Sequence, residues 1–108
     1  MSETKHITKA DGTQLWLTDD RLDRSDGPAL IWADGTQFWC RDGWLHREDG
    51  PAAVYPNGTR LWYQDGKRHR TDGPALIYPD GSAEWWVDGK FVRRWVDGEF
   101  VRGEEAKR

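Results

Sequence analysis

The sequence has few aliphatic residues, a single cysteine and no long apolar run. Leu, Ile, Val and Phe together account for 18 of the 108 residues, below the ~20% at which a charged chain is suspected of disorder. Cys40 alone excludes an intrachain disulfide and a thiolate zinc cluster, and it favours a reducing compartment. No apolar run approaches the ~18 residues of a membrane span. The first six residues, Met-Ser-Glu-Thr-Lys-His, lack the apolar stretch of a signal peptide. We therefore expect a cytoplasmic protein.

Charge of neither sign dominates. The chain has 16 basic and 19 acidic residues and a net charge of −3, and the two signs are interleaved along its length. This balance does not favour binding to nucleic acid or to an anionic membrane. We expect no membrane partner, and we consider a nucleic-acid partner unlikely on these grounds.

Tryptophan is abundant and compensates for the missing aliphatic residues. The chain has 8 Trp and 3 Tyr, and each such side chain can bury roughly 150–250 Å². Columns of aromatic side chains can therefore replace an aliphatic core. We predict a folded chain that forms one domain.

Internal repetition determines the expected architecture, because several residue types recur every 23 residues. Asp-Gly-Thr or a close variant begins at positions 11, 34, 57 and 80, and Asp-Gly-Pro-Ala begins at positions 26, 49 and 72. The same interval separates the tryptophans Trp16, Trp39, Trp62 and Trp85 and the arginines Arg24, Arg47, Arg70 and Arg93. We predict a single repeat domain over residues 1–103, with units 11–33, 34–56, 57–79 and 80–103 and an N-terminal strand over 5–10.

The elements expected within a unit are short strands. No segment has helical periodicity. Residues 75–78 and 82–87 are typical of two strands, and Pro79-Asp80-Gly81 between them suits a type I turn whose glycine takes a left-handed bulge position. The connector over 65–74 is expected to act as a long turn that has room for a third short strand. The predicted fold is an all-β, elongated antiparallel β-hairpin array. A three-sided solenoid of 23-residue coils is the competing geometry.

The C-terminal part departs from this pattern. Residues 86–94 are followed by a near copy at 95–103, without an intervening Gly-Pro-Ala block. We predict a C-terminal double-hairpin cap that pairs the last edge of the sheet, since an open edge invites aggregation. Residues 104–108 are expected to form a disordered tail.

The repeat resembles a known family. Residues 65–69, Asp-Gly-Lys-Arg-His, and 78–82, Tyr-Pro-Asp-Gly-Ser, resemble the MORN repeat, a 23-residue β-hairpin unit. The His-Arg-x-x-Gly-Pro-Ala segments at 46–52 and 69–75 are similar to MORN-like repeats of bacteriophage and large-virus proteins and of bacterial antitoxins. The resemblance covers about residues 11–103. It implies a β-hairpin fold and a binding role, with no catalytic residues.

The aromatic columns are the first candidate site. The tryptophans either fill the same hole between units or form a platform for a ligand. Strand alternation places Phe38 and Cys40 on the face opposite Trp39, so both faces of a sheet would carry apolar side chains. A single-layer sheet would leave one of them partly exposed, which favours a protein partner or a homodimer.

His46 and His69 are the second candidate site. They suggest a metal pair or an acid–base group, but the third histidine, His6, lies outside the units and Asp23 and Val92 occupy the equivalent positions. We therefore favour a role in which the imidazole hydrogen-bonds a turn. The Asp-Gly aspartates are expected to cap local N–H groups, and the nonapeptide spacing of calcium-binding β-rolls is absent. No cofactor or metal is predicted.

The arginine column is the third candidate site. Each of the first three arginines precedes the aspartate of an Asp-Gly-Pro-Ala block by two residues, which permits a ladder of ion pairs worth roughly 0–1 kcal/mol each when exposed. The functional alternative is a row of guanidinium groups for a phosphate-rich or acidic partner.

The sequence as a whole favours a non-enzymatic protein-binding module, of the kind a phage or mobile element uses to inhibit another protein by occupying its surface. We predict binding through one aromatic face of the central units, since interfaces concentrate their energy in Trp, Tyr and Arg. Capture of a small ligand or nucleotide between aromatic columns is the alternative, and an enzyme ranks third. The predicted partner-binding residues are Trp39, Tyr55, Trp62 and Tyr78 at the centre, Arg47 and Arg70 at the rim, and His46 and His69.

Overall fold

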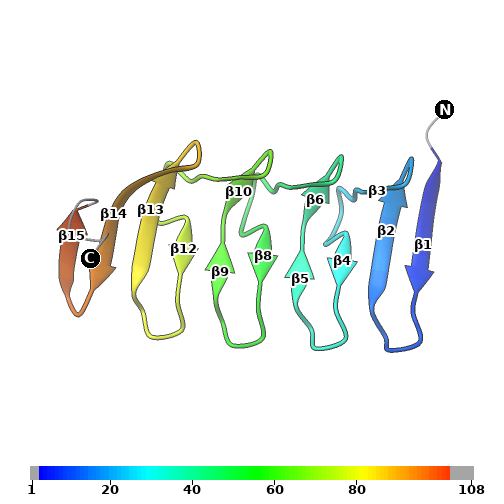
Figure 1. Ribbon diagram of the computed structural model, residues 1–108, viewed down its shortest axis with the longest axis horizontal. Helices are drawn as coiled ribbons and strands as arrows, with labels where there is room; N and C mark the ends of the chain where they lie inside the picture. Colours follow the sequence, from blue (N-terminus) through cyan, green and yellow to red (C-terminus); the bar gives the residue numbers. More distant parts are fainter. Residues whose placement is uncertain (1–2, 103–108) are drawn as a thin grey trace.

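The computed structural model describes residues 3–102 and is built from antiparallel β-strands, without a helix in that part of the chain (Figure 1). Five strands are longer than two residues: β1 (Thr4–Thr8), β2 (Gln14–Thr18), β13 (Ala83–Val87), β14 (Lys90–Val96) and β15 (Glu99–Arg102). The two-residue strands are β3 (Arg21–Leu22), β4 (Leu30–Ile31), β5 (Gln37–Phe38), β6 (Cys40–Arg41), β7 (Trp44–Leu45), β8 (Ala53–Val54), β9 (Arg60–Leu61), β10 (Tyr63–Gln64), β11 (Lys67–Arg68) and β12 (Leu76–Ile77). The predicted all-β antiparallel class is confirmed, and the predicted disordered tail, 104–108, lies outside the described residues.

One large sheet runs the length of the molecule. It has 11 strands in the order β1-β2-β4-β5-β8-β9-β12-β13-β14-β15, with β3 paired to β2. Two small sheets, β6-β7 and β10-β11, continue strands β5 and β9 beyond the central tryptophan. The molecule measures 47 × 29 × 23 Å, and neighbouring strands run in opposite directions (Figure 1). A three-sided solenoid would instead stack parallel strands.

The turn predicted from Pro79-Asp80-Gly81 joins β12 to β13 at the lower end of the strands in Figure 1. The N–H of Gly81 donates to the carbonyl of Tyr78 at 3.1 Å, and the N–H of Tyr78 donates to the carbonyl of Ser82 at 2.9 Å. Gly81 has a φ of 89°, which glycine adopts without a steric cost. The Asp80 carboxylate accepts the N–H of Ser82 at 2.8 Å. The equivalent turns beginning at Asp11, Asp34 and Asn57 have the same side-chain bond.

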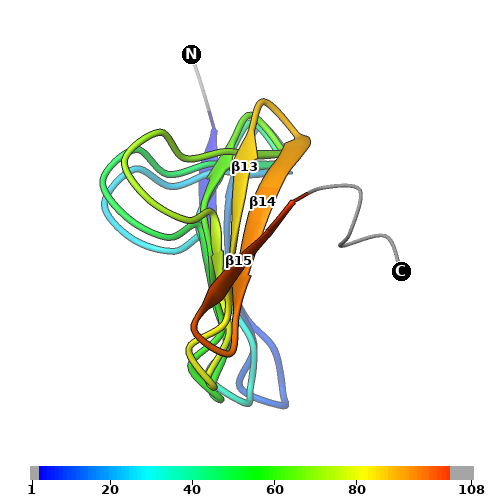
Figure 2. The same cartoon turned by 90° about the vertical axis from the view of Figure 1, so that its left-hand side faces the viewer.

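A second set of hairpins lies at the opposite end of the strands. Asp65 and Gly66 both have positive φ, 48° and 78°, which is typical of a two-residue type I′ turn. This turn joins β10 to β11, so the connector does contain a third short strand. The chain then leaves the sheet in a wide loop before β12. The three loops over 23–28, 46–51 and 69–74 project from the same side of the sheet (Figure 2).

The last three strands form a meander. β13 pairs with β14, and β14 pairs with β15, through turns at Asp88-Gly89 and Asp97-Gly98. The register shifts between Trp85 and Trp86, whose partners Arg93 and Phe91 leave Val92 of β14 as the extra residue of a β-bulge. The ring of Phe100 lies 5.3 Å from that of Trp85 and 4.6 Å from that of Trp95, so aromatic packing holds this end together.

Candidate binding surfaces

The two faces of the sheet carry different aromatic side chains. Leu61 is paired with both Ala53 and Leu76, and directly paired residues share a face. Their cluster is extended by Phe38, Tyr55, Tyr63 and Tyr78. We call the face with these seven residues, together with Leu30 and Trp32, the tyrosine face. The opposite, tryptophan face carries Trp16, Trp39, Trp62 and Trp85.

The prediction of one shared aromatic surface is therefore wrong. Tyr55 and Tyr78 pack around Leu61, whereas Trp62 lies between Leu61 and Tyr63 in the chain and points to the other side of the sheet. Successive side chains of a strand point to opposite faces of the sheet, and the tryptophans of the predicted set alternate with the tyrosines in this way. The two kinds of ring therefore lie on opposite faces. The predicted binding set did not include Trp32, Phe38 or Tyr63, although strand alternation had already placed Phe38 on the face opposite Trp39.

On the tryptophan face, each ring in the first three units is covered by an arginine of the following loop. The guanidinium carbon lies 3.9 Å from the ring centroid for Arg24 on Trp16, 3.7 Å for Arg47 on Trp39 and 4.1 Å for Arg70 on Trp62. We call these pairs the Arg–Trp stacks. Cation–π attraction of about 0.5–2 kcal/mol accompanies such geometry.

Each stacked guanidinium also has two polar partners within its own loop. Nε of Arg47 donates to Asp49 at 3.0 Å, and Nη1 donates to the carbonyl of Pro51 at 3.2 Å. Arg24 and Arg70 repeat both bonds. Because the ring, the carboxylate and the carbonyl occupy most of the guanidinium, Arg47 and Arg70 shape their loops. The pairing of each arginine with the aspartate two residues on is the arrangement that permits an ion-pair ladder.

The glycine of Asp-Gly-Pro-Ala closes the other side of each stack. A Cβ built on Gly50 would lie 2.9 Å from Cζ of Arg47, and the distances at Gly27 and Gly73 are 2.7 and 2.8 Å. None of these three glycines has positive φ. A side chain at any of these positions would therefore require the guanidinium to shift.

His46 and His69 join each unit to the next. Nδ1 of His46 accepts the backbone N–H of Asp65 at 2.9 Å, and Nδ1 of His69 accepts that of Asp88 at 2.9 Å. In the first unit the Asp23 carboxylate accepts the N–H of Asp42 at 2.8 Å. These bonds match the turn-bonding interpretation of the histidines. The imidazole must then carry its proton on Nε2.

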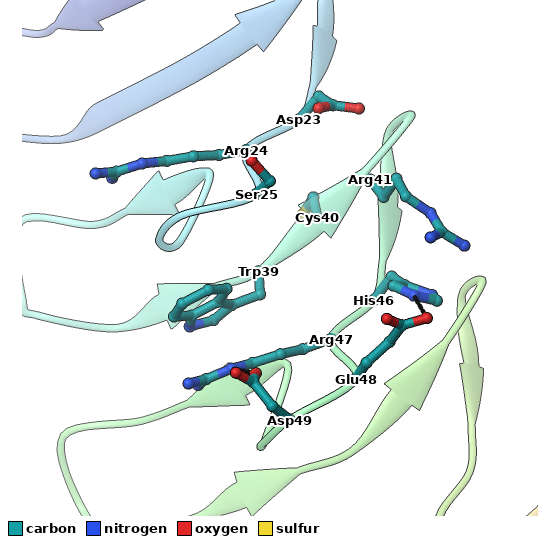
Figure 3. Close-up of a pocket in the computed structure, with 10 residues that line it drawn as sticks. All are labelled: Asp23, Arg24, Ser25, Trp39, Cys40, Arg41, His46, Arg47, Glu48 and Asp49. Carbon is teal, nitrogen blue, oxygen red and sulfur yellow. Dashed lines mark hydrogen bonds and ion pairs between the residues drawn. The ribbon is translucent and has the colours of Figure 1, made fainter.

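A cavity of about 320 Å³ lies between the first and second loops (Figure 3). Trp39, His46 and the two stacked arginines Arg24 and Arg47 line it. His46 is 8% exposed, and its Nε2 has no hydrogen-bond partner within residues 3–102, the carboxylate of Glu48 lying 3.7 Å away. Nε1 of Trp39 is likewise buried without a partner among the described residues. A second cavity, of about 550 Å³, lies between the second loop, 46–51, and the third loop, 69–74.

The tyrosine face is not covered by a second layer of the described chain, since the three wide loops lie on the other side (Figure 2). Trp32 meets Phe38 edge to face at 4.4 Å, and Phe38 meets Tyr55 at 6.0 Å. Trp32 remains 36% exposed. These rings form an amphipathic ridge across successive hairpins, and exposed aromatic patches of this kind mark interaction sites.

A polar cluster ends this ridge near the C-terminal meander. Glu84, with a side chain 13% exposed, accepts the indole N–H of Trp86 at 2.8 Å and lies 3.4 Å from the Tyr78 hydroxyl. Arg68 approaches the same carboxylate at 3.9 Å. Burial, followed by the charge of Glu84, raises the pKa of Tyr78, so its hydroxyl stays protonated and able to donate.

The lone thiol is not placed for chemistry. Cys40 is buried, and this burial, with a smaller effect of Asp23, raises its pKa to about 11. A thiol with such a pKa is a poor nucleophile near neutral pH.

No group of three or more His, Cys, Asp or Glu side chains within residues 3–102 is placed to hold a metal ion. No helix in that range has the length and apolarity needed to cross a membrane. Comparisons with family models, with curated proteins and with solved structures found no match to this chain.

Proposed function

We propose that this chain is a non-enzymatic protein-binding module that acts by occupying a surface of a partner protein. In this proposal the hairpins form a MORN-like array of four units, closed at one end by the C-terminal meander. The role is that of an inhibitor or antitoxin-like protein of a phage or mobile element. The supporting observation is the tyrosine face, an aromatic ridge that no described element covers.

The partition of the candidate residues supports this choice of surface. Trp39 and Trp62 are each covered by an arginine, and His46 and His69 hold turns of the next unit. Among the described residues, Tyr55 has no such structural partner of its own on the tryptophan side, because its ring packs on the tyrosine face against the cluster that contains Leu61. Tyrosine and tryptophan provide large contact areas at a low cost in side-chain entropy, which suits them to interfaces.

The test uses a matched pair of exposed tryptophans. Trp32 lies on the tyrosine face and is 36% exposed. Trp44 is 61% exposed and is paired with Arg41. Because Cys40 and Arg41 alternate, Trp44 lies on the same side of the sheet as Trp39, which is the tryptophan face. A partner recovered with the wild-type chain is titrated against Trp32→Ala and Trp44→Ala. We expect Trp32→Ala to weaken binding at least about tenfold, the loss of roughly 1.4 kcal/mol, and Trp44→Ala to have little effect. The opposite order would assign binding to the tryptophan face.

The second candidate is a small ligand, and the cavity beside Trp39 and His46 is the supporting observation, because each side chain has a buried nitrogen without a partner in the described part of the chain. A ligand at about one hundred times its dissociation constant adds about 2.7 kcal/mol to stability. A thermal-shift screen of acids and nucleotides against the wild type and His46→Asn therefore tests this alternative. A stabilisation that His46→Asn abolishes would favour it over the protein-binding role.

A further inference from the structure

We propose that β1 is a dimerisation edge, to which β1 of a second copy of this chain pairs antiparallel, centred on His6. β1 is the first strand of the large sheet and pairs with β2 alone among the described strands. All five of its residues are exposed. The inference is independent of the proposed function.

The outward backbone groups of β1 follow from its register. Lys9 donates to Thr13 at 2.8 Å, and Asp19 donates to Glu3 at 2.8 Å. Hydrogen-bonded pairs alternate along an antiparallel ladder, so Lys5 and Ile7 also bond inward, to Leu17 and Leu15. The N–H and C=O groups of the alternate residues, Thr4, His6 and Thr8, therefore point away from the sheet.

These three residues are spaced symmetrically about His6. A two-fold axis perpendicular to the sheet places His6 opposite His6 of the second copy, and Thr4 opposite Thr8 of the second copy. Every outward donor then meets an outward acceptor, which yields six backbone hydrogen bonds across the new junction. The strand contains no proline and no bulge that would obstruct such pairing.

The side chains also fit this register. Lys5 would lie opposite Ile7 of the second copy, so no like charges are paired. The ammonium of Lys5 already forms ion pairs with Glu3 at 3.3 Å and Asp20 at 3.6 Å. Its charge therefore opposes the pairing of another strand less than a free edge lysine would. The imidazole of His6 stacks on Trp16 at 4.2 Å, over the inner neighbour, and leaves the junction open. Ile7, 40% exposed, would gain a cover.

The opposite edge of the sheet is less suited to this pairing. β15 has four residues, and its two-residue turn makes Val96 and Glu99 a hydrogen-bonded pair. Its outward groups are then limited to Phe100 and Arg102. The C-terminal edge therefore provides a matched control position for the N-terminal one.

The first experiment measures the mass of the full chain by sedimentation equilibrium over a range of concentrations. We expect the wild type to reach about 25 kDa, twice the 12.5 kDa of one chain. His6→Pro removes an outward donor, and proline is tolerated at such an edge position, so this variant should remain folded by circular dichroism and sediment as a monomer. Arg102→Pro makes the same change on the other edge and should leave the dimer intact.

A second pair of variants keeps the test decisive if His6→Pro fails to fold. Ile7→Lys brings the introduced lysine opposite Lys5 of the second copy, whereas Ile7→Glu brings an opposite charge there, twice in each dimer. Both remove the same apolar side chain from the monomer. We expect the dimer dissociation constant of Ile7→Lys to exceed that of Ile7→Glu about tenfold or more at low salt, with the difference shrinking as salt is added.

Three outcomes would overturn the proposal. One is a wild type that stays at 12.5 kDa up to about millimolar concentration, the range of the weakest specific association. Another is equal dimerisation of Ile7→Lys and Ile7→Glu at low salt. The third is a dimer that Tyr55→Ala dissociates while His6→Pro does not, which would assign the contact between copies to the tyrosine face.

Discussion

The guanidinium carbon of Arg47 lies 3.7 Å from the centroid of the Trp39 ring, and the α-carbon of Gly50 closes the other side of that guanidinium. The ring, the cation and the glycine thus form one layered unit, repeated at Trp16 and Trp62 with Arg24 and Arg70. The loop over 46–51 owes its shape to this unit, because Asp49 and the Pro51 carbonyl bind the same guanidinium.

The glycine side of this unit is tested by Gly50→Ala. The added Cβ would lie 2.9 Å from Cζ of Arg47, so the guanidinium must move off Trp39, and we expect a loss of about 1–3 kcal/mol in the free energy of unfolding. In the background of Arg47→Ala the space is free and the same change should cost little. Urea unfolding of the two single variants and the double variant measures this coupling. Strictly additive losses would show that the glycine does not contact the arginine in solution.

His46 is predicted to contribute through its acceptor atom. His46→Ala leaves the N–H of Asp65 without its partner, and we expect a loss of about 1–3 kcal/mol in stability. His46→Asn keeps an acceptor, as the Asp23 carboxylate does in the first unit, and should lose less than half as much. Chemical denaturation at neutral pH provides the comparison. Equal losses would indicate that imidazole packing, not the hydrogen bond, is what matters at this position.

Cys40 should resist modification until the chain unfolds. Burial raises its thiol pKa to about 11, so little thiolate forms at about pH 8, and the sulfur is also shielded from reagent. We expect an aromatic disulfide reagent to react slowly with the native protein and at once in concentrated urea. Fast labelling of the native protein, with an unchanged circular dichroism spectrum, would contradict the buried position.

The turn aspartates predict a loss of stability in acid. The Asp34 carboxylate accepts hydrogen bonds from the N–H and the hydroxyl of Thr36, and these bonds lower its pKa. Bonds from Thr13 and Ser82 lower the pKa values of Asp11 and Asp80 in the same way. A carboxyl group whose pKa is lowered by folding stabilises the fold at every pH above its pKa in the unfolded chain, 3.8. This contribution is lost as the pH falls through the lower pKa of the folded state. Stability should therefore decline below about pH 4.

Asn57 occupies the equivalent position in the third unit and bonds Thr59 without titrating. The triple variant Asp11→Asn, Asp34→Asn and Asp80→Asn should therefore have a flatter pH dependence below about pH 4, measured by urea midpoints, than the wild type. An unchanged slope would assign the acid sensitivity to other carboxylates.

The hairpins could be predicted from the sequence because their determinants are local. Asp80-Gly81 specifies a turn through the positive φ of its glycine, and strand alternation separates Trp39 from Phe38. The Arg–Trp stacks could not be predicted in this way. Arg47 and Trp39 are eight residues apart, and their contact depends on the path by which a loop returns to its own strand. The glycine of Gly-Pro-Ala likewise belonged to a connector expected to act as a long turn, and nothing in that pattern predicted the guanidinium that lies beside it.

The bonds from His46 to Asp65 and from His69 to Asp88 run in one direction along the chain, each unit serving the turn of its successor. These bonds add to the apolar contact that also links neighbouring hairpins, such as that of Ala53 with Leu61. Backbone bonds cross the same junctions in the other sense, from the N–H of Arg47 to the carbonyl of Tyr63 at 3.2 Å and from the N–H of Arg70 to the carbonyl of Trp86 at 3.0 Å. Each of these junctions is therefore reciprocal, and removal of either neighbour leaves a backbone N–H without its partner in the segment that remains.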